Sequence, residues 1–88
     1  MTIFPTRQFK IALATRIIDK PELVALFEKS FERFLANPRD SLLQAHKLHG
    51  QLKDHCAFSV DHDCRVIYRE LAPEKIALID IGTHDEVY

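Results

Sequence analysis

The apolar residues of this chain change their spacing at Pro38, and that change restricts the folds it can adopt. Over residues 24–35 they recur every three or four positions, which predicts an amphipathic helix. Residues 56–61 alternate apolar and polar side chains, and residues 64–71 and 75–82 are rich in β-branched and aromatic ones, so all three segments are predicted to be strands. A helical block followed by a block of strands indicates an α+β protein.

Two more elements are predicted before this helix. Residues 2–4 form a short strand that Pro5 stops, and the apolar spacing over Arg7–Ile18 predicts a first helix. Asp19 is the expected N-cap of the second helix, with Pro21 in its first turn. The order is then strand, helix, helix and a three-stranded antiparallel meander. We expect the helices to gather on one face of the sheet and to leave the other face open for a site.

Length and charge narrow the classes of protein further. The 88 residues have room for one domain, which we assign to residues 1–88. Residues 1–60 carry nine Lys and Arg against six Asp and Glu, residues 61–88 carry three against seven, and the net charge is −1. This balance excludes a uniformly basic nucleic-acid binder. With no signal-peptide pattern, no membrane-spanning run and no disulfide framework in the sequence, we expect a cytoplasmic protein with reduced thiols.

Side chains that carry chemistry are concentrated in one part of the chain. They are His46, His49, Lys53, His55, Cys56, His62, Asp63, Cys64, Arg65 and His84. The histidines and cysteines are zinc-ligand types, but no CxxC pair occurs, and the two cysteines fall on different strands. The ordinary alternative is that the loop histidines are solvated and the cysteines pack as small hydrophobic residues.

Acid–base chemistry without a metal is the third interpretation. One histidine could deprotonate a ribose 2′-hydroxyl while another protonates the leaving 5′-oxygen, and a guanidinium would stabilise the charge on the phosphoryl oxygens. Alternation along residues 64–71 suggests that Val66 and Tyr68 face the helices. Arg65, Ile67 and Arg69 would then face the other side of the sheet. Composition and spacing alone leave all three interpretations open.

Three ordered motifs add a family resemblance over residues 46–88. The stretches "HKLHG", "DCRVIY" and "IGTHDEVY" resemble the C-terminal half of the RelE/ParE-superfamily toxins, in particular the YafQ-like branch of the RelE/StbE mRNA interferases. The resemblance implies a fold like that of the microbial ribonucleases. It also implies an endoribonuclease of a type II toxin–antitoxin system, which cuts mRNA on the ribosome by 2′-hydroxyl attack without a metal or other cofactor. The implied partners are a cognate antitoxin, mRNA and the ribosome, with no membrane and no homo-oligomer unless the antitoxin is present.

The same resemblance implies the roles of individual residues. His46 and His84 correspond to the proton-transfer pair, and Arg65 corresponds to the arginine that stabilises charge on the phosphate. Asp63 would orient a histidine or share in the acid–base work, and Tyr88 would stack on a base. The implied RNA-binding residues are Lys47, Lys53 and Arg69.

The sequence also departs from the family pattern at two positions. Ser59 stands where close relatives have a further histidine, and Cys64 stands where they have an aromatic residue. Two alternatives therefore stay open: a ParE-like toxin that inhibits DNA gyrase, and a catalytically degenerate member that only binds its antitoxin. Retention of His46, Asp63 and His84 favours the nuclease, because a gyrase binder has no need of these side chains.

Overall fold

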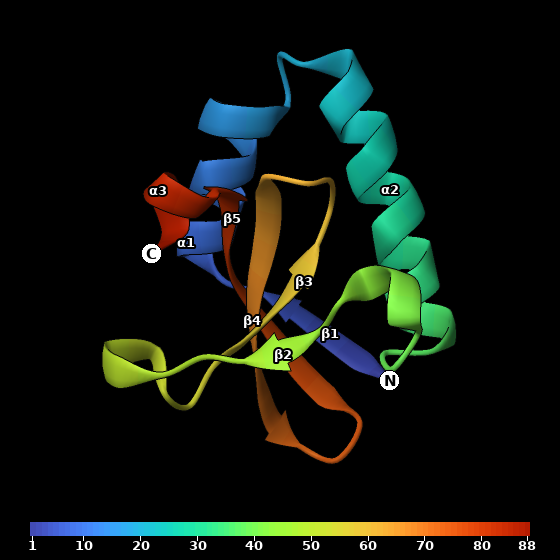
Figure 1. Ribbon diagram of the computed structural model, residues 1–88, viewed down its shortest axis with the longest axis vertical. Coiled ribbons are helices and arrows are strands. Elements are labelled where there is room, and N and C mark those ends of the chain that lie inside the picture. Colours follow the sequence, from blue (N-terminus) through green and yellow to red (C-terminus); the bar gives the residue numbers. More distant parts are fainter.

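One mixed five-stranded sheet runs through the molecule, with its two longest strands in the middle (Figure 1). The computed structural model describes all of residues 1–88. The strand order is β1-β5-β4-β3-β2. The elements in chain order are β1 (Thr2–Pro5), α1 (Arg7–Ala12), a π-helical stretch (Leu13–Ile17), α2 (Pro21–Ala36), a 3₁₀ turn (Ser41–Leu43), β2 (His46–Lys47), a second 3₁₀ turn (Gly50–Leu52), β3 (Cys56–Ser59), β4 (Cys64–Ala72), β5 (Lys75–Thr83) and α3 (His84–Val87).

The α+β architecture and the antiparallel meander β3–β4–β5 are as predicted. The first strand pairs parallel to β5, with Ile3 opposite Ile76, so the two ends of the chain meet in the sheet. The edge strand β2 was not predicted. It has only two residues, His46 and Lys47, and both are exposed and polar, so the sequence gives no alternation there.

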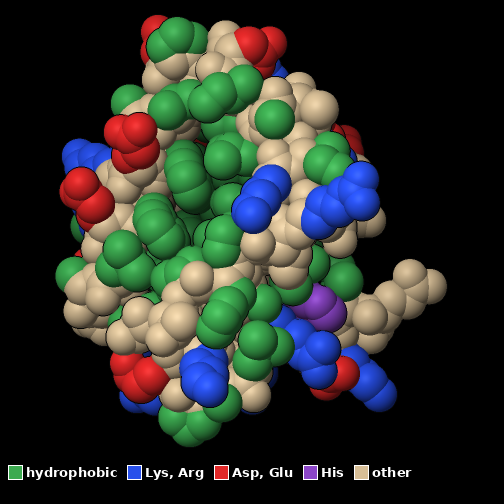
Figure 2. Space-filling view, turned by 180° about the vertical axis from the view of Figure 1, so that it is seen from behind, with side chains coloured by type: hydrophobic (Ala, Val, Ile, Leu, Met, Phe, Trp, Pro, Cys, Tyr) green, Lys and Arg blue, Asp and Glu red, His purple; other side chains and the backbone are tan.

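The main core lies between the sheet and the two long helices. Phe34 of α2 stacks on Phe58 with ring centroids 4.8 Å apart and meets Tyr68 edge-on at 5.0 Å. Val66 and Tyr68 therefore face the helices, as the alternation predicted. Viewed from behind (Figure 2), the molecule shows apolar side chains gathered in a hollow with charged residues around it. Over residues 7–36, the exposed large apolar residues are Ile11, Ile18, Leu26 and Leu35.

The helical hairpin differs from the prediction at two points. The first helix does not continue as an α-helix to Ile18, because its last turns are a π-helix. Asp19 is not the N-cap of α2. Pro21 occupies the first helical position, where its missing N–H is harmless, and this makes Lys20 the cap residue without a side-chain hydrogen bond.

The second face of the sheet is not fully open, contrary to the expectation. Ile67 points to this face and is 1 % exposed, because it lies in a second small core. The other members of that core are Leu48, Leu52, Ala57, Ile79 and Val87. An apolar residue at the centre of a strand needs cover from water, and the segment after β2 and the short helix α3 provide it. No helix of the chain is both long and apolar enough to cross a membrane.

Candidate functional site

The C-terminal turn α3 places His84 and Tyr88 together. Thr83 ends β5 and caps α3, because its hydroxyl accepts the Glu86 N–H while the Glu86 carboxylate accepts the Thr83 N–H. This reciprocal capping box closes a helix of only four residues. The His84 and Tyr88 rings then meet edge-on with centroids 4.6 Å apart.

A first groove, which we call the histidine groove, joins the β2 segment to the C-terminus. Its volume is about 440 Å³, and its lining residues are His46, Lys47, Leu48, His49, Gln51, Leu52 and Tyr88. Three residues to which the resemblance gives a role therefore line one groove: His46, Lys47 and Tyr88. His49 and Gln51 are additional lining residues. His49 is among the chemistry-bearing side chains of the sequence, with a solvated loop histidine as the ordinary alternative, but the resemblance gives it no role.

The ring of His46 is oriented by a backbone carbonyl. Its Nδ1 lies 3.0 Å from the Gln44 carbonyl oxygen. A carbonyl oxygen only accepts hydrogen bonds, so Nδ1 carries the hydrogen and Nε2 of the neutral ring is left with a free lone pair. The arrangement gives His46 the tautomer that can accept a proton at Nε2.

Arg65 is held by the backbone of the β3–β4 turn. Its guanidinium donates to the carbonyl oxygens of Asp61 (2.8 Å), Cys64 (3.2 Å) and His62 (3.2 Å). No carboxylate forms an ion pair with it, so its charge stays available. Burial raises the pKa of Tyr88, against an opposing effect of Arg65, and the phenol is neutral at physiological pH.

Asp63 does not make the contact with a histidine that the resemblance implied. It is exposed in the β3–β4 turn, and its carboxylate takes part in no hydrogen bond or ion pair. Asp61 organises this turn instead, because its Oδ1 accepts the N–H groups of Asp63 (2.8 Å) and Cys64 (2.6 Å). Burial of Asp61 acts in the opposite direction, but these hydrogen bonds leave its pKa below the ordinary value. Sequence reasoning missed Asp61, although an Asp at the start of a turn is a known signal.

A second groove, which we call the lysine groove, contains all three of the implied RNA-binding residues. Lys47, Lys53 and Arg69 line a space of about 450 Å³. Its other lining residues are Asp54, His55, Cys56, Glu70, Ala72 and Pro73. Lys47 lines both grooves, so the two grooves adjoin at β2.

The zinc interpretation finds no support in the arrangement of the side chains. No three of the His, Cys, Asp and Glu side chains gather where they could hold a metal ion. Cys64 is buried, and burial raises the pKa of its thiol to about 11, so it packs as a neutral side chain. His84 and Arg65 do not line the histidine groove, but Tyr88 does, and its ring contacts the ring of His84.

The fold is that of the RelE/YafQ-like toxins, as the resemblance implied. YafQ from E. coli strain BL21(DE3) matches with a TM-score of 0.80 and 18 % identity, over 98 % of this chain and 96 % of that chain. A YoeB/ParE toxin from Agrobacterium tumefaciens matches with a TM-score of 0.77 and 14 % identity, over 96 % and 99 %. A chain of the E. coli DinJ–YafQ toxin–antitoxin complex matches with a TM-score of 0.75 and 20 % identity, over 98 % and 94 %. No family model and no curated protein matches the sequence.

Proposed function

We propose that this protein is the toxin of a type II toxin–antitoxin system and that it acts as a metal-independent endoribonuclease on mRNA. The observation that supports this best is the pair of adjoining grooves. His46 and Tyr88 line one, Lys53 and Arg69 line the other, and Lys47 lines both. A strand of RNA needs this combination: proton-transfer groups at the scissile bond and cations along its phosphates.

The reaction proceeds by transfer of two protons around one phosphodiester. Nε2 of His46 accepts the proton of a ribose 2′-hydroxyl, whose oxygen attacks the phosphorus. The bond from phosphorus to the 5′-oxygen breaks, and His84 donates a proton to that oxygen. The products are a 2′,3′-cyclic phosphate and a free 5′-hydroxyl. The hydrogen bond from His46 Nδ1 to the Gln44 carbonyl supports His46 as the base.

Arg65 and Tyr88 serve the same phosphodiester in different ways. The guanidinium of Arg65 has no carboxylate partner, and it stabilises the charge that builds on the phosphoryl oxygens. The neutral ring of Tyr88 is 45 % exposed and stacks on a base next to the scissile bond. The carboxylate of Asp63 has no partner in the nearby turn. It orients a histidine or shares in the acid–base work only once RNA is bound.

The cations of the lysine groove hold the RNA backbone. Lys47, Lys53 and Arg69 contribute three positive charges, and Asp54 and Glu70 offset two of them. Binding by the free protein is therefore weak and depends on salt, which fits a nuclease whose substrate is presented by the ribosome in the cytoplasm.

A cognate antitoxin covers the helical surface. Exposed large apolar residues occur along residues 7–36, and they suit the apolar side of an amphipathic segment of a partner. The solved DinJ–YafQ complex shows a protein of this fold bound to its antitoxin.

Expression in bacterial cells without an antitoxin tests the proposal. We expect growth arrest with cleaved mRNA for the wild type, and neither effect for His46→Ala or His84→Ala. Arrest with intact mRNA and altered DNA supercoiling would point to a ParE-like gyrase inhibitor. Normal growth with the wild type, together with tight binding to the product of an adjacent gene, would point to a degenerate member that only binds its antitoxin.

A further inference from the structure

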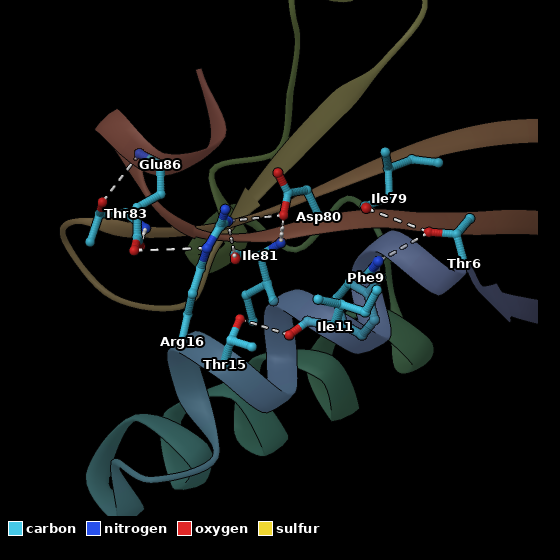
Figure 3. Close-up of polar contacts among 10 residues, drawn as sticks. All are labelled: Thr6, Phe9, Ile11, Thr15, Arg16, Ile79, Asp80, Ile81, Thr83 and Glu86. Carbon is cyan, nitrogen blue, oxygen red and sulfur yellow. Dashed lines mark hydrogen bonds and ion pairs between the residues drawn. The ribbon is translucent and has the colours of Figure 1, made fainter.

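Arg16 reaches from the π-helical stretch to the end of β5 and to α3 (Figure 3). Its Nη1 lies 3.1 Å from Asp80 Oδ1 and donates to the Ile81 carbonyl oxygen, also at 3.1 Å. Its Nε lies 3.8 Å from Glu86 Oε2. One guanidinium thus contacts the strand that precedes the C-terminal turn and the turn itself.

Asp80 is the fixed end of this arrangement. It is 8 % exposed, and its Oδ1 also accepts the Ile81 N–H at 2.9 Å. A carboxylate this deeply buried needs a charged partner, and removal of that partner is strongly destabilising. Arg16 is therefore held against β5, even though 64 positions separate it from Asp80 in the sequence.

Glu86 is the exposed end of this arrangement. One carboxylate oxygen accepts the Thr83 N–H at 2.8 Å, and the other faces Arg16. The hydrogen bond from the Thr83 backbone lowers the pKa of Glu86, and the charges of Arg16 and Lys20 add to this effect. The carboxylate that closes the capping box is thus also the one that the guanidinium attracts.

Gly82 leaves the space in which these groups meet. A Cβ atom at this position would lie 2.8 Å from Glu86 Oε1 and 3.0 Å from Arg16 Nη1. Real Cβ contacts are almost never as short as 2.8 Å, and the glycine allows the carboxylate and the guanidinium to lie directly over the strand.

We propose that Arg16 is a positioning residue for the C-terminal turn: through Asp80 and Glu86 it holds α3 on the sheet and thereby sets the place of His84 and Tyr88. The proposal rests on the proposed function, because it assigns these two side chains to the reaction. Arg16 lies on a different segment from both grooves, and none of its hydrogen-bond or ion-pair partners lines them. Its effect on activity is therefore transmitted by α3.

The test is NMR spectroscopy of the free full-length protein, which requires no RNA. In the wild type, the edge-on contact of Tyr88 with His84 gives nuclear Overhauser effects between the two rings and a ring-current shift on the imidazole protons. We expect Arg16→Met and Glu86→Gln to weaken both signals and to move the imidazole shifts toward those of an unstructured peptide. Arg16→Lys should restore them in part. The matched control is Arg33→Met, which removes another arginine whose Nε lies 3.8 Å from an aspartate, Asp40, and should leave the signals unchanged.

Arg16→Met alone leaves Asp80 buried without a partner and can unfold the protein. The double variant Arg16→Met/Asp80→Asn removes both charges, and it should fold while its ring signals are weakened. Unchanged ring signals in this folded variant and in Glu86→Gln would overturn the proposal. On RNA, the variants should lower kcat by about 10- to 100-fold with little change in KM, because the lysine groove is intact. Failure of the wild type to cleave RNA would overturn the proposed function and leave the NMR result standing.

Discussion

The ring of Tyr88 meets the imidazole of His84 edge-on, with centroids 4.6 Å apart and an interplanar angle of 72°. Tyr88 also lines the histidine groove together with His46, so one side chain contacts His84 and shares a groove with the other member of the proposed proton-transfer pair. The ring is needed for this contact, whereas the hydroxyl forms no hydrogen bond within the protein. Function should therefore depend on the ring and not on the phenol.

Tyr88→Phe is expected to keep most of the RNA-cleaving activity, and Tyr88→Ala is expected to lose it. Stacking of an aromatic side chain on a base contributes about 1–3 kcal/mol, so the loss in kcat/KM for the alanine variant is about 5- to 150-fold. Steady-state cleavage of a short RNA by both variants checks this. Equal losses in Phe and Ala variants would instead assign the role to the hydroxyl.

His46→Gln should remove the proposed base while leaving β2 in place. General base catalysis contributes about 10²- to 10⁴-fold, and we expect kcat to fall by that factor with KM nearly unchanged. The matched control is His62→Gln, which changes an exposed histidine in the β3–β4 turn that lines neither groove. If the two variants lose activity equally, His46 has no special role.

Lys53→Gln should weaken RNA binding and make the binding constant less dependent on salt concentration. Each phosphate contact to single-stranded nucleic acid adds about 0.7 to the slope of log K against log salt concentration, so the variant should lose about that much slope. Binding titrations at several salt concentrations provide the measurement. Lys29→Gln on the exposed side of α2 is the control, and it should leave the slope of the wild type intact.

Acid should remove the contribution of Glu86 to stability. The pKa of this carboxyl in the folded protein lies below the ordinary value of 4.5. Its contribution is therefore fully present above that value and disappears as the pH falls through the lower folded pKa. The wild type should have a higher Tm than Glu86→Gln near neutral pH, and the difference should shrink as the pH falls below 4.5. A difference in Tm that persists in acid would show that the charge of Glu86 is not its source.

The sequence predicted the parts of the fold that local patterns determine. Alternation in the segment that became β4 placed Val66 and Tyr68 correctly, since a strand turns successive side chains to opposite faces. The predicted N-cap of α2, Asp19, lies one residue too early in the sequence. Pro21 occupies the first helical position, and this makes Lys20 the N-cap although Asp is a favourable capping residue. Two exposed residues such as His46 and Lys47 carry no pattern that would predict β2.

The candidate site was predictable only in part, for a related reason. His46, Lys47 and Tyr88 were suggested by the resemblance, and the fold brings them to one groove. The pair of Arg16 and Asp80 has no local signal, because only the packing of the first helix on β5 brings these residues together. Long-range charge pairs of this kind follow from the fold and are not visible in the order of residues.

Analysis of the RNA ends after incubation with the purified protein tests the proposed reaction most directly. Translating ribosomes with a defined mRNA are treated with the wild type or with His84→Gln. We predict that the wild type produces fragments with a 2′,3′-cyclic phosphate and a 5′-hydroxyl, and that the variant produces them at a rate lower by about 10²-fold or more. Intact mRNA with the wild type, or equal cleavage by both proteins, would contradict the proposal.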